Sequence, residues 1–204
     1  MITSNSFRKN YEQGVDRFYE KNGNSYHNPH EPKLKRVFQL MLQKWGVEVV
    51  NFNRVLDLAC GSGEVSAAIQ TFFTARNRSV VLGPINVNDE IDPDKIYIEA
   101  ADPFTHEAYE KRLGLVPQTY SFADVEGGIL SDKQFDVTIS SYAMHLIDQS
   151  RLFTTCQALA LVSAKLIVIS PHKRPEIAPS MGWTLEEEFT ETKVHVKLYR
   201  SMFF

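Results

Sequence analysis

Cysteine is scarce in this 204-residue sequence: there are two, Cys60 and Cys156, and they lie far apart along the chain. So few cysteines give no sign of a disulfide framework, and we expect a reduced, cytoplasmic protein. Long apolar runs are also missing, since no run approaches the roughly 20 residues that a membrane-spanning helix needs. The first residues lack the apolar core of a signal peptide. We therefore expect neither a membrane span nor secretion.

An excess of charge of one sign is absent as well. The 22 basic and 25 acidic residues are mixed along the chain and give a net charge of −3. A basic surface for nucleic acid is therefore not indicated. Apolar residues, in contrast, make up 43% of the chain, which is enough for one substantial core. We expect a single domain over residues 1–204.

Helical periodicity marks the N-terminal part. Apolar residues recur at helical spacing over residues 11–19 and again over residues 34–45, and the turn-rich segment "NGNSYHNPHEP" lies between them. Two helices are therefore predicted before the first strand. We expect residues 1–50 to form a helical lid over the rest of the domain.

Short apolar strands alternate with helices through the rest of the chain. The strand signal occurs in "RVLDLA", "KIYIEAAD", "FDVTISS" and "KLIVIS", with "TYSF" as a shorter candidate. Helices are expected over residues 64–73, 105–113 and 149–161. Strands separated by helices pair in parallel through right-handed crossovers. The last two strands, "WTLEEEFTE" and "KVHVKLYRS", are adjacent and predict an antiparallel hairpin.

The sequence thus predicts an α/β fold, a three-layer α/β/α sandwich around a mostly parallel seven-stranded sheet with a C-terminal antiparallel hairpin. Residues 74–95 fit the alternation badly, and we interpret them as an insertion. Within it, "VVLGPINV" could form a small extra hairpin, followed by an acidic segment typical of a solvated loop.

The most informative stretch is "VLDLACGSGEVS", residues 55–66, where an apolar strand stops at two glycines. Gly61 and Gly63 lack a Cβ, so the backbone can turn sharply and approach a ligand at the carboxyl ends of the strands. The Gly-Lys-Ser/Thr ending of a nucleoside triphosphate loop is missing. Ser66 stands where the dinucleotide fingerprint has its third small residue, which leaves a nicotinamide cofactor open. Asp57 would repel a pyrophosphate and attract an ammonium group, and it therefore favours a cationic ligand.

The pattern D-x-x-C-G-S-G resembles the first motif of the class I methyltransferases that use S-adenosylmethionine, and the order of strands and helices resembles theirs over residues 54–201. The resemblance implies that the cofactor's methionine part is held by Asp57, Gly61 and Gly63. It implies that Asp102, after the second strand, holds the ribose. If the insertion is misplaced, Glu99 or Asp92 takes that role instead.

The same resemblance assigns the adenine to the end of the third strand. Phe122 would pack on the adenine ring, and Asp124 would accept hydrogen bonds from its amino group. The alternative for Asp124 is the cap of a helix N-terminus, because Asp is a preferred capping residue.

Residues beside the transferred methyl group are implied after the fourth strand, in "SSYAMHLI". This stretch resembles relatives that act on small molecules and lacks the Asn/Asp-Pro-Pro-Tyr pattern of amide and adenine methylation. Ser140 is expected against the cofactor. Tyr142 and His145 are candidate catalytic residues, as is His172 in "SPHKRPEI", although a packing or capping role is the alternative for a histidine at the start of a helix. Arg174 would grip an anionic acceptor or pair with Glu176.

The segment before the first strand supplies further candidates. In many relatives this segment covers the cofactor and the substrate, so Tyr26 and His30 are expected to bind the acceptor and exclude water. Two histidines in a turn without a third ligand do not predict a metal site. Cys60, under a glycine turn, is interpreted as a small buried thiol rather than a nucleophile.

The sequence therefore predicts an S-adenosylmethionine-dependent methyltransferase that acts on a small molecule and releases S-adenosylhomocysteine. Three alternatives stay open: a non-catalytic S-adenosylmethionine-binding partner or activating subunit, a methyltransferase that acts on protein or tRNA with a partner subunit, and a nicotinamide-dependent oxidoreductase.

Overall fold

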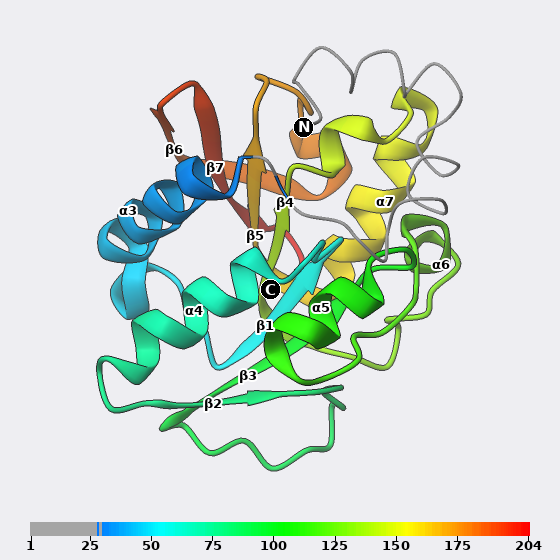
Figure 1. Ribbon diagram of the computed structural model, residues 1–204. Coiled ribbons are helices and arrows are strands. Elements are labelled where there is room, and N and C mark those ends of the chain that lie inside the picture. Colours follow the sequence, from blue (N-terminus) through cyan, green and yellow to red (C-terminus); the bar gives the residue numbers. More distant parts are fainter. Residues whose placement is uncertain (1–27, 29) are drawn as a thin grey trace.

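The computed structural model describes residue 28 and residues 30–204 (Figure 1). The helix predicted over residues 11–19 and most of the predicted lid, Tyr26 included, lie outside the described residues. The second predicted helix is present as α3 (Glu31–Val49).

One seven-stranded sheet forms the centre of the described chain, with the order β2-β3-β1-β4-β5-β7-β6. The strands are β1 (Arg54–Leu58), β2 (Ser79–Leu82), β3 (Lys95–Ala101), β4 (Phe135–Ser141), β5 (Ser163–Ser170), β6 (Trp183–Glu191) and β7 (Val194–Ser201). The pairs from β2 to β5 are parallel, whereas β7 is antiparallel to both β5 and β6. The mostly parallel sheet and its C-terminal hairpin are therefore as predicted.

Helices cover both faces of this sheet. They are α4 (Glu64–Thr74), α5 (His106–Leu113), α6 (Phe122–Glu126) and α7 (Gln149–Val162), with short 3₁₀ turns η3 (Met144–Leu146) and η4 (Pro179–Met181). Figure 1 shows α3 and α4 to one side of the central strands and α6 and α7 to the other. None of the helices in the described residues is long and apolar enough to cross a membrane.

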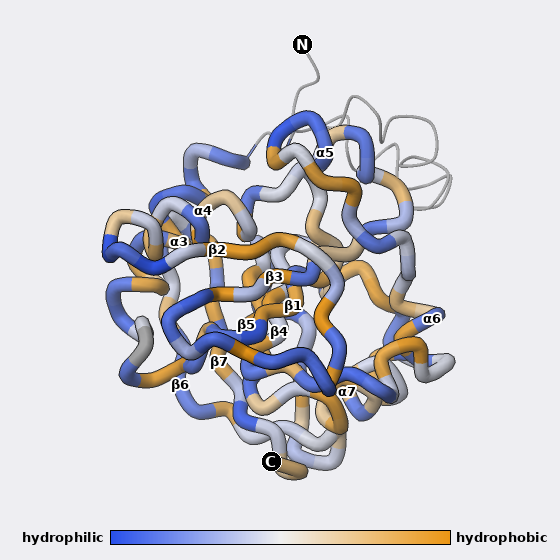
Figure 2. The backbone as a smooth tube through the Cα atoms, turned by 90° about the horizontal axis from the view of Figure 1, so that it is seen from below, coloured by the Kyte–Doolittle hydropathy of each residue, from blue (hydrophilic) through white to orange (hydrophobic). Residues whose placement is uncertain are grey.

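Alternation along each strand divides the core into two layers. In β1, Val55 packs in the cluster that includes α3 and α4, while its neighbour Leu56 packs in the cluster that includes α7. The same alternation separates Ile167 from Leu166 in β5. Because successive side chains of a strand point to opposite faces, an apolar run such as "RVLDL" is buried on both. Figure 2 shows hydrophobic stretches along β1 and the strands around it. The three-layer sandwich is confirmed.

The interpretation of residues 74–95 as containing a small hairpin is wrong. Ser79–Leu82 form β2, which pairs in parallel with β3 at the edge of the main sheet. The strand predicted over "TYSF" is also wrong. Ser121 caps α6 there, and the segment before it makes only an isolated bridge between Gln118 and Ala101. The edge position beside β3 is taken by β2, so the number of strands is unchanged.

A buried carboxylate fixes the connection between β2 and β3. Glu99 on β3 is fully buried, and its Oε2 accepts hydrogen bonds from the backbone N–H of Ile85 at 2.6 Å and from Lys133 Nζ at 2.8 Å. Its Oε1 accepts a hydrogen bond from the Tyr120 hydroxyl at 3.0 Å. Glu99 is therefore committed to the fold, and because it is fully buried and does not line the pocket described below, its position argues against Glu99 as the alternative ribose ligand. The other alternative, Asp92, pairs with Lys95 on the surface.

Candidate functional site

The turn between β1 and α4 carries the glycine motif. Gly61 and Gly63 have φ angles of 57° and 85°, in the left-handed region that glycine tolerates best. A Cβ added to Gly63 would lie 2.7 Å from Leu113 Cδ1 and 3.0 Å from the Tyr109 ring of α5. Gly63 therefore permits close packing of α5 on the turn, and it does not line the pocket below, whereas Gly61 does.

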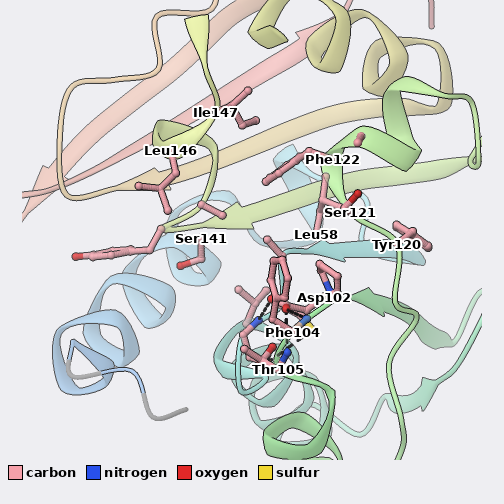
Figure 3. Close-up of a pocket in the computed structure, with 18 of the residues that line it drawn as sticks. Leu58, Asp102, Phe104, Thr105, Tyr120, Ser121, Phe122, Ser141, Leu146 and Ile147 are labelled. Carbon is pink, nitrogen blue, oxygen red and sulfur yellow. Dashed lines mark hydrogen bonds between the residues drawn. The ribbon is translucent and has the colours of Figure 1, made fainter. Parts of the chain in front are cut away.

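A pocket of about 620 Å³ opens at the carboxyl ends of β1, β3 and β4. In Figure 3, Leu146, Ile147 and Phe122 approach it from one side, and Asp102, Phe104 and Thr105 from the other. Its wall is formed by Asn28, Leu58–Gly61, Glu64, Val65, Asp102–Thr105, Tyr120–Ala123, Ser141–Ala143, Leu146–Asp148 and Arg151. This is the edge of an open α/β sheet where ligands bind, and the volume is in the range of small-molecule sites.

Asp102 is brought into this pocket as predicted. Its Oδ1 accepts hydrogen bonds from the backbone N–H groups of Phe104 at 2.9 Å and Thr105 at 3.1 Å, and its Oδ2 accepts one from Gly61 at 3.1 Å. Burial raises the pKa of this carboxyl, although the hydrogen bonds lower it. Since a carboxylate has about four acceptor sites, Oδ2 retains capacity for a ligand hydroxyl.

The structure corrects the position of Asp57. Its side chain is fully buried and does not line the pocket. Oδ2 accepts hydrogen bonds from the Ser66 hydroxyl at 2.6 Å and the Ser66 backbone N–H at 3.1 Å, and Oδ1 has no partner in the described part of the chain. Burial raises its pKa to about 7. Asp57 thus holds the first turn of α4, and its carboxylate does not face the cavity.

Glu64 lines the pocket instead, and sequence reasoning missed it. It is the first residue of α4 and is 8% exposed, and its Oε1 accepts a hydrogen bond from the Ser62 hydroxyl at 2.6 Å. The available signal was its position directly after the second glycine, where the helix begins at the mouth of the crevice. Tyr120, Phe104, Ser141 and Arg151 also line the pocket and were likewise missed.

Of the two residues assigned to adenine, one lines the pocket and the other does not. Phe122 lines the pocket as predicted. Asp124 is exposed and does not line it. Its Oδ2 accepts hydrogen bonds from the backbone N–H and the hydroxyl of Ser121, which completes a capping box at the start of α6 and lowers the pKa of Asp124. The capping alternative describes Asp124, with Ser121 as the N-cap itself.

Ser140 is also placed differently from the expectation. It is fully buried and does not line the pocket, whereas the next residue, Ser141, does. Neighbouring residues of β4 point to opposite faces of the sheet, and this one-residue difference therefore moves the hydroxyl away from the cavity.

The candidate catalytic residues form a row of rings beside the pocket. Tyr142 lines the pocket and has a left-handed φ of 58°. Its ring centroid lies 5.4 Å from that of His30 and 6.4 Å from that of His145, and His145 lies 5.6 Å from His172. The three histidines do not line the pocket themselves. The structure thus brings together residues from α3's N-terminal cap, the turn directly after β4, η3 and the loop after β5.

Burial favours the neutral form of two histidines of this row, His145 and His30. Burial, with a smaller effect from His172, lowers the pKa of His145 to about 4. Burial also lowers the pKa of His30. The Nδ1 atom of His145 is buried without a hydrogen-bond partner among the described residues. Arg174 and Glu176 are exposed, outside the pocket wall, and do not pair with each other.

Thiol and metal chemistry receive no support from the described residues. Cys60 is buried, and burial raises its pKa well above the usual value, as expected for an unreactive thiol. No group of three or more His, Cys, Asp or Glu side chains in the described part of the chain is arranged to hold a metal ion.

The charge in the pocket wall is mainly negative. Glu64, Asp102 and Asp148 contribute carboxylates, and Arg151 contributes the one guanidinium among the wall residues that the structure describes. Arg151 is paired with Glu126, to which its Nε and Nη2 donate hydrogen bonds of 3.0 and 3.1 Å. The pocket can therefore attract a cation and accept hydrogen bonds from hydroxyl groups.

A curated protein matches nearly the whole length of this chain. The chain is 34% identical to the uncharacterized protein C17A5.05c of Schizosaccharomyces pombe over 227 aligned positions, covering 96% of this chain and 92% of that protein. No family model matches the sequence.

Solved structures resemble the fold at low sequence identity. Magnesium protoporphyrin IX methyltransferase from Synechocystis PCC 6803, with bound S-adenosylmethionine, has a TM-score of 0.55 and 13% identity over 98% of each chain. The N-methyltransferase NodS from Bradyrhizobium japonicum WM9, with S-adenosylhomocysteine, has a TM-score of 0.57 and 12% identity over 95% of this chain and 99% of its own. The chain belongs to the same family as C17A5.05c of Schizosaccharomyces pombe, and its fold is that of the class I S-adenosylmethionine-dependent methyltransferases.

Proposed function

We propose that this protein is an S-adenosylmethionine-dependent methyltransferase that acts on a small-molecule acceptor. The observation that carries the proposal is the position of Asp102 and Glu64, two carboxylates in the wall of a 620 Å³ pocket at the carboxyl edge of the sheet. S-adenosylmethionine is elongated and carries an ammonium, a sulfonium and two ribose hydroxyls. An anionic, hydroxyl-accepting pocket suits such a ligand better than it suits a pyrophosphate.

The residues of the wall fit the parts of this cofactor. Asp102 would accept a hydrogen bond from the ribose, through the capacity left on its Oδ2. Tyr120 and Phe122 would contact the flat adenine ring. Asn28 is 6% exposed and also lines the pocket, where its amide would be available to the amino acid end.

The cofactor, when bound, would supply an electrophilic methyl group on its sulfonium. The contribution of the chain would then be alignment of the acceptor and exclusion of water, the main requirements of an in-line displacement. Leu146 and Ile147 form an apolar side of the pocket and would exclude water. Tyr142 would position the acceptor, and the imidazoles of His145 and His172, in the row beside it, would accept a proton from the acceptor.

Two observations support a small acceptor. The pocket is concave, with apolar and polar walls in a volume typical of small-molecule sites. The methyltransferases named above include one of magnesium protoporphyrin IX, and we extend action on a small molecule to this chain as part of the proposal.

Incubation with labelled S-adenosylmethionine and fractionated cell extract tests this function. We expect label to appear in a small-molecule fraction. His145→Ala and His172→Ala should reduce the labelling while S-adenosylhomocysteine affinity is kept. His195→Ala, on β7 and outside both the pocket wall and the row of rings, serves as the control. Label in the protein or RNA fraction would overturn the small acceptor. Tight cofactor binding with no label in any fraction would favour a non-catalytic binding partner.

A further inference from the structure

The Glu64 side chain has one carboxylate oxygen committed to the fold and one left over. Oε1 accepts the hydrogen bond from Ser62 at 2.6 Å, and Oε2 accepts none from the described part of the chain. The residue is 8% exposed and lines the pocket. A carboxylate oxygen that the described protein groups leave unbonded in a pocket wall is open to a donor on the ligand, and a charged donor makes the stronger hydrogen bond. The unused oxygen of Glu64 therefore offers a place for a positively charged group of a ligand in the pocket.

The other acidic groups near the pocket do not fill this role. Asp57 is directed at Ser66 and does not line the cavity. Asp102 already accepts three backbone hydrogen bonds, and Asp148 is exposed at the rim. The wall's guanidinium, Arg151, is held by Glu126. Among the described wall residues, Glu64 is thus the buried carboxylate that has one oxygen accepting no hydrogen bond from them.

Resting on the proposed function, we infer that Glu64 binds the ammonium group at the amino acid end of S-adenosylmethionine, the role that the motif had assigned to Asp57. Gly61 lies between the two ends of the site, since its N–H is bound to Asp102 and Glu64 follows it by three residues. A ligand with hydroxyls near Asp102 and an ammonium near Glu64 would run across the bare face of the turn. The ammonium would donate a charge-assisted hydrogen bond to Oε2.

Calorimetric titration with two ligands isolates this contact. S-adenosylhomocysteine has the ammonium but no sulfonium, and 5′-methylthioadenosine keeps the nucleoside while lacking the whole amino acid end. Glu64→Gln keeps an oxygen for the Ser62 hydroxyl and removes the charge. We expect it to weaken S-adenosylhomocysteine binding about 10-fold or more, the scale of a lost hydrogen bond to a charged group. Its affinity for 5′-methylthioadenosine should stay that of the unsubstituted protein.

Glu90→Gln is the matched control, because Glu90 is exposed and outside the pocket wall. It should bind both ligands as the unsubstituted protein does. Equal S-adenosylhomocysteine affinity in Glu64→Gln and the unsubstituted protein would overturn the inference and leave the proposed function standing. A parallel loss of both ligands would overturn it too, because the effect would then be structural. If the unsubstituted protein binds neither ligand, the proposed function fails and the inference fails with it.

Discussion

The carboxylate of Asp102 accepts a hydrogen bond from the backbone N–H of Gly61 at 3.1 Å, across 41 residues of sequence. A second bond in the opposite direction, from the Thr105 hydroxyl to the Gly61 carbonyl at 2.7 Å, closes the same link. Together they tie the end of β3 to the glycine turn after β1. The shape of the pocket floor therefore depends on two loops that hold each other.

Replacing Asp102 should affect both stability and nucleoside binding. In Asp102→Asn the remaining oxygen can serve Phe104 and Thr105, and the amide then faces the Gly61 N–H, donor against donor. We expect the free energy of unfolding to fall by about 1–2 kcal/mol and adenosine affinity to fall about tenfold. Urea denaturation and calorimetry measure the two effects, with the exposed Asp94→Asn as control. Unchanged adenosine affinity would remove Asp102 from the ribose site.

The close packing around Gly63 predicts that an alanine there lowers the free energy of unfolding more than an alanine at another left-handed glycine does. Gly63→Ala would press on the Tyr109 ring, which is 1% exposed and anchored by its hydroxyl to Ser66 at 3.0 Å. Gly114 has a φ of 75° but nothing within 4 Å of an added Cβ. We expect Gly114→Ala to cost about 1 kcal/mol from backbone strain and Gly63→Ala about 2–4 kcal/mol from strain plus overpacking. Equal urea unfolding midpoints for Gly63→Ala and Gly114→Ala would refute the packing role of Gly63.

The raised pKa of Asp57 predicts that the free energy of unfolding depends on pH. Burial raises its pKa from 3.8 to about 7, so the folded protein holds this proton more tightly than the unfolded chain does. Its contribution to stability is therefore fully present below pH 4 and is lost as the pH rises to about 7. Asp57→Asn keeps an oxygen for Ser66 and should flatten this decline by at least about 1 kcal/mol. Urea unfolding across the window measures it, and parallel profiles for the two proteins would contradict the assignment.

The ion pair between Glu99 and Lys133 predicts that the free energy of unfolding depends strongly on the Lys133 ammonium group. The Glu99 side chain is 0% exposed and the Lys133 side chain 14%, so Lys133→Met would leave a buried carboxylate without its cation. We expect a loss of about 3 kcal/mol in the free energy of unfolding. Lys95→Met breaks the exposed pair with Asp92 and should cost at most about 1 kcal/mol. A Lys133→Met protein as stable as Lys95→Met would show that the network is not needed.

Sequence patterns predicted the elements whose signal is local. Apolar runs with both faces buried gave β1, β3, β4 and β5, and the alternation of Val194, Val196 and Leu198 gave the last strand. The edge strand β2 was misread because its burial alternates weakly and it pairs in parallel without a helix before β3. The strand predicted over "TYSF" was wrong because Ser121 begins a capping box with Asp124, three residues further on, which starts α6.

The direction of a side chain was the harder part of the site. Asp102, Gly61, Phe122 and Tyr142 line the pocket as expected. Asp57 and Ser140 belong to the right strands but point elsewhere, because a one-residue step along a strand reverses the face. Glu64 was overlooked for a related reason, since its burial in the wall follows from how α4 leaves the turn. Spacing gives the alternation along a strand, but which of its two faces meets the pocket is decided by tertiary contacts.

Ligand-dependent thermal stability tests the central claim most directly. A ligand that binds the folded state raises its free energy of unfolding by about 2.7 kcal/mol at a concentration 100 times its Kd. We predict that S-adenosylhomocysteine raises the melting temperature of the unsubstituted protein in a concentration-dependent way, while NAD at the same concentrations does not. A shift with NAD equal to or larger than that with S-adenosylhomocysteine would contradict the account.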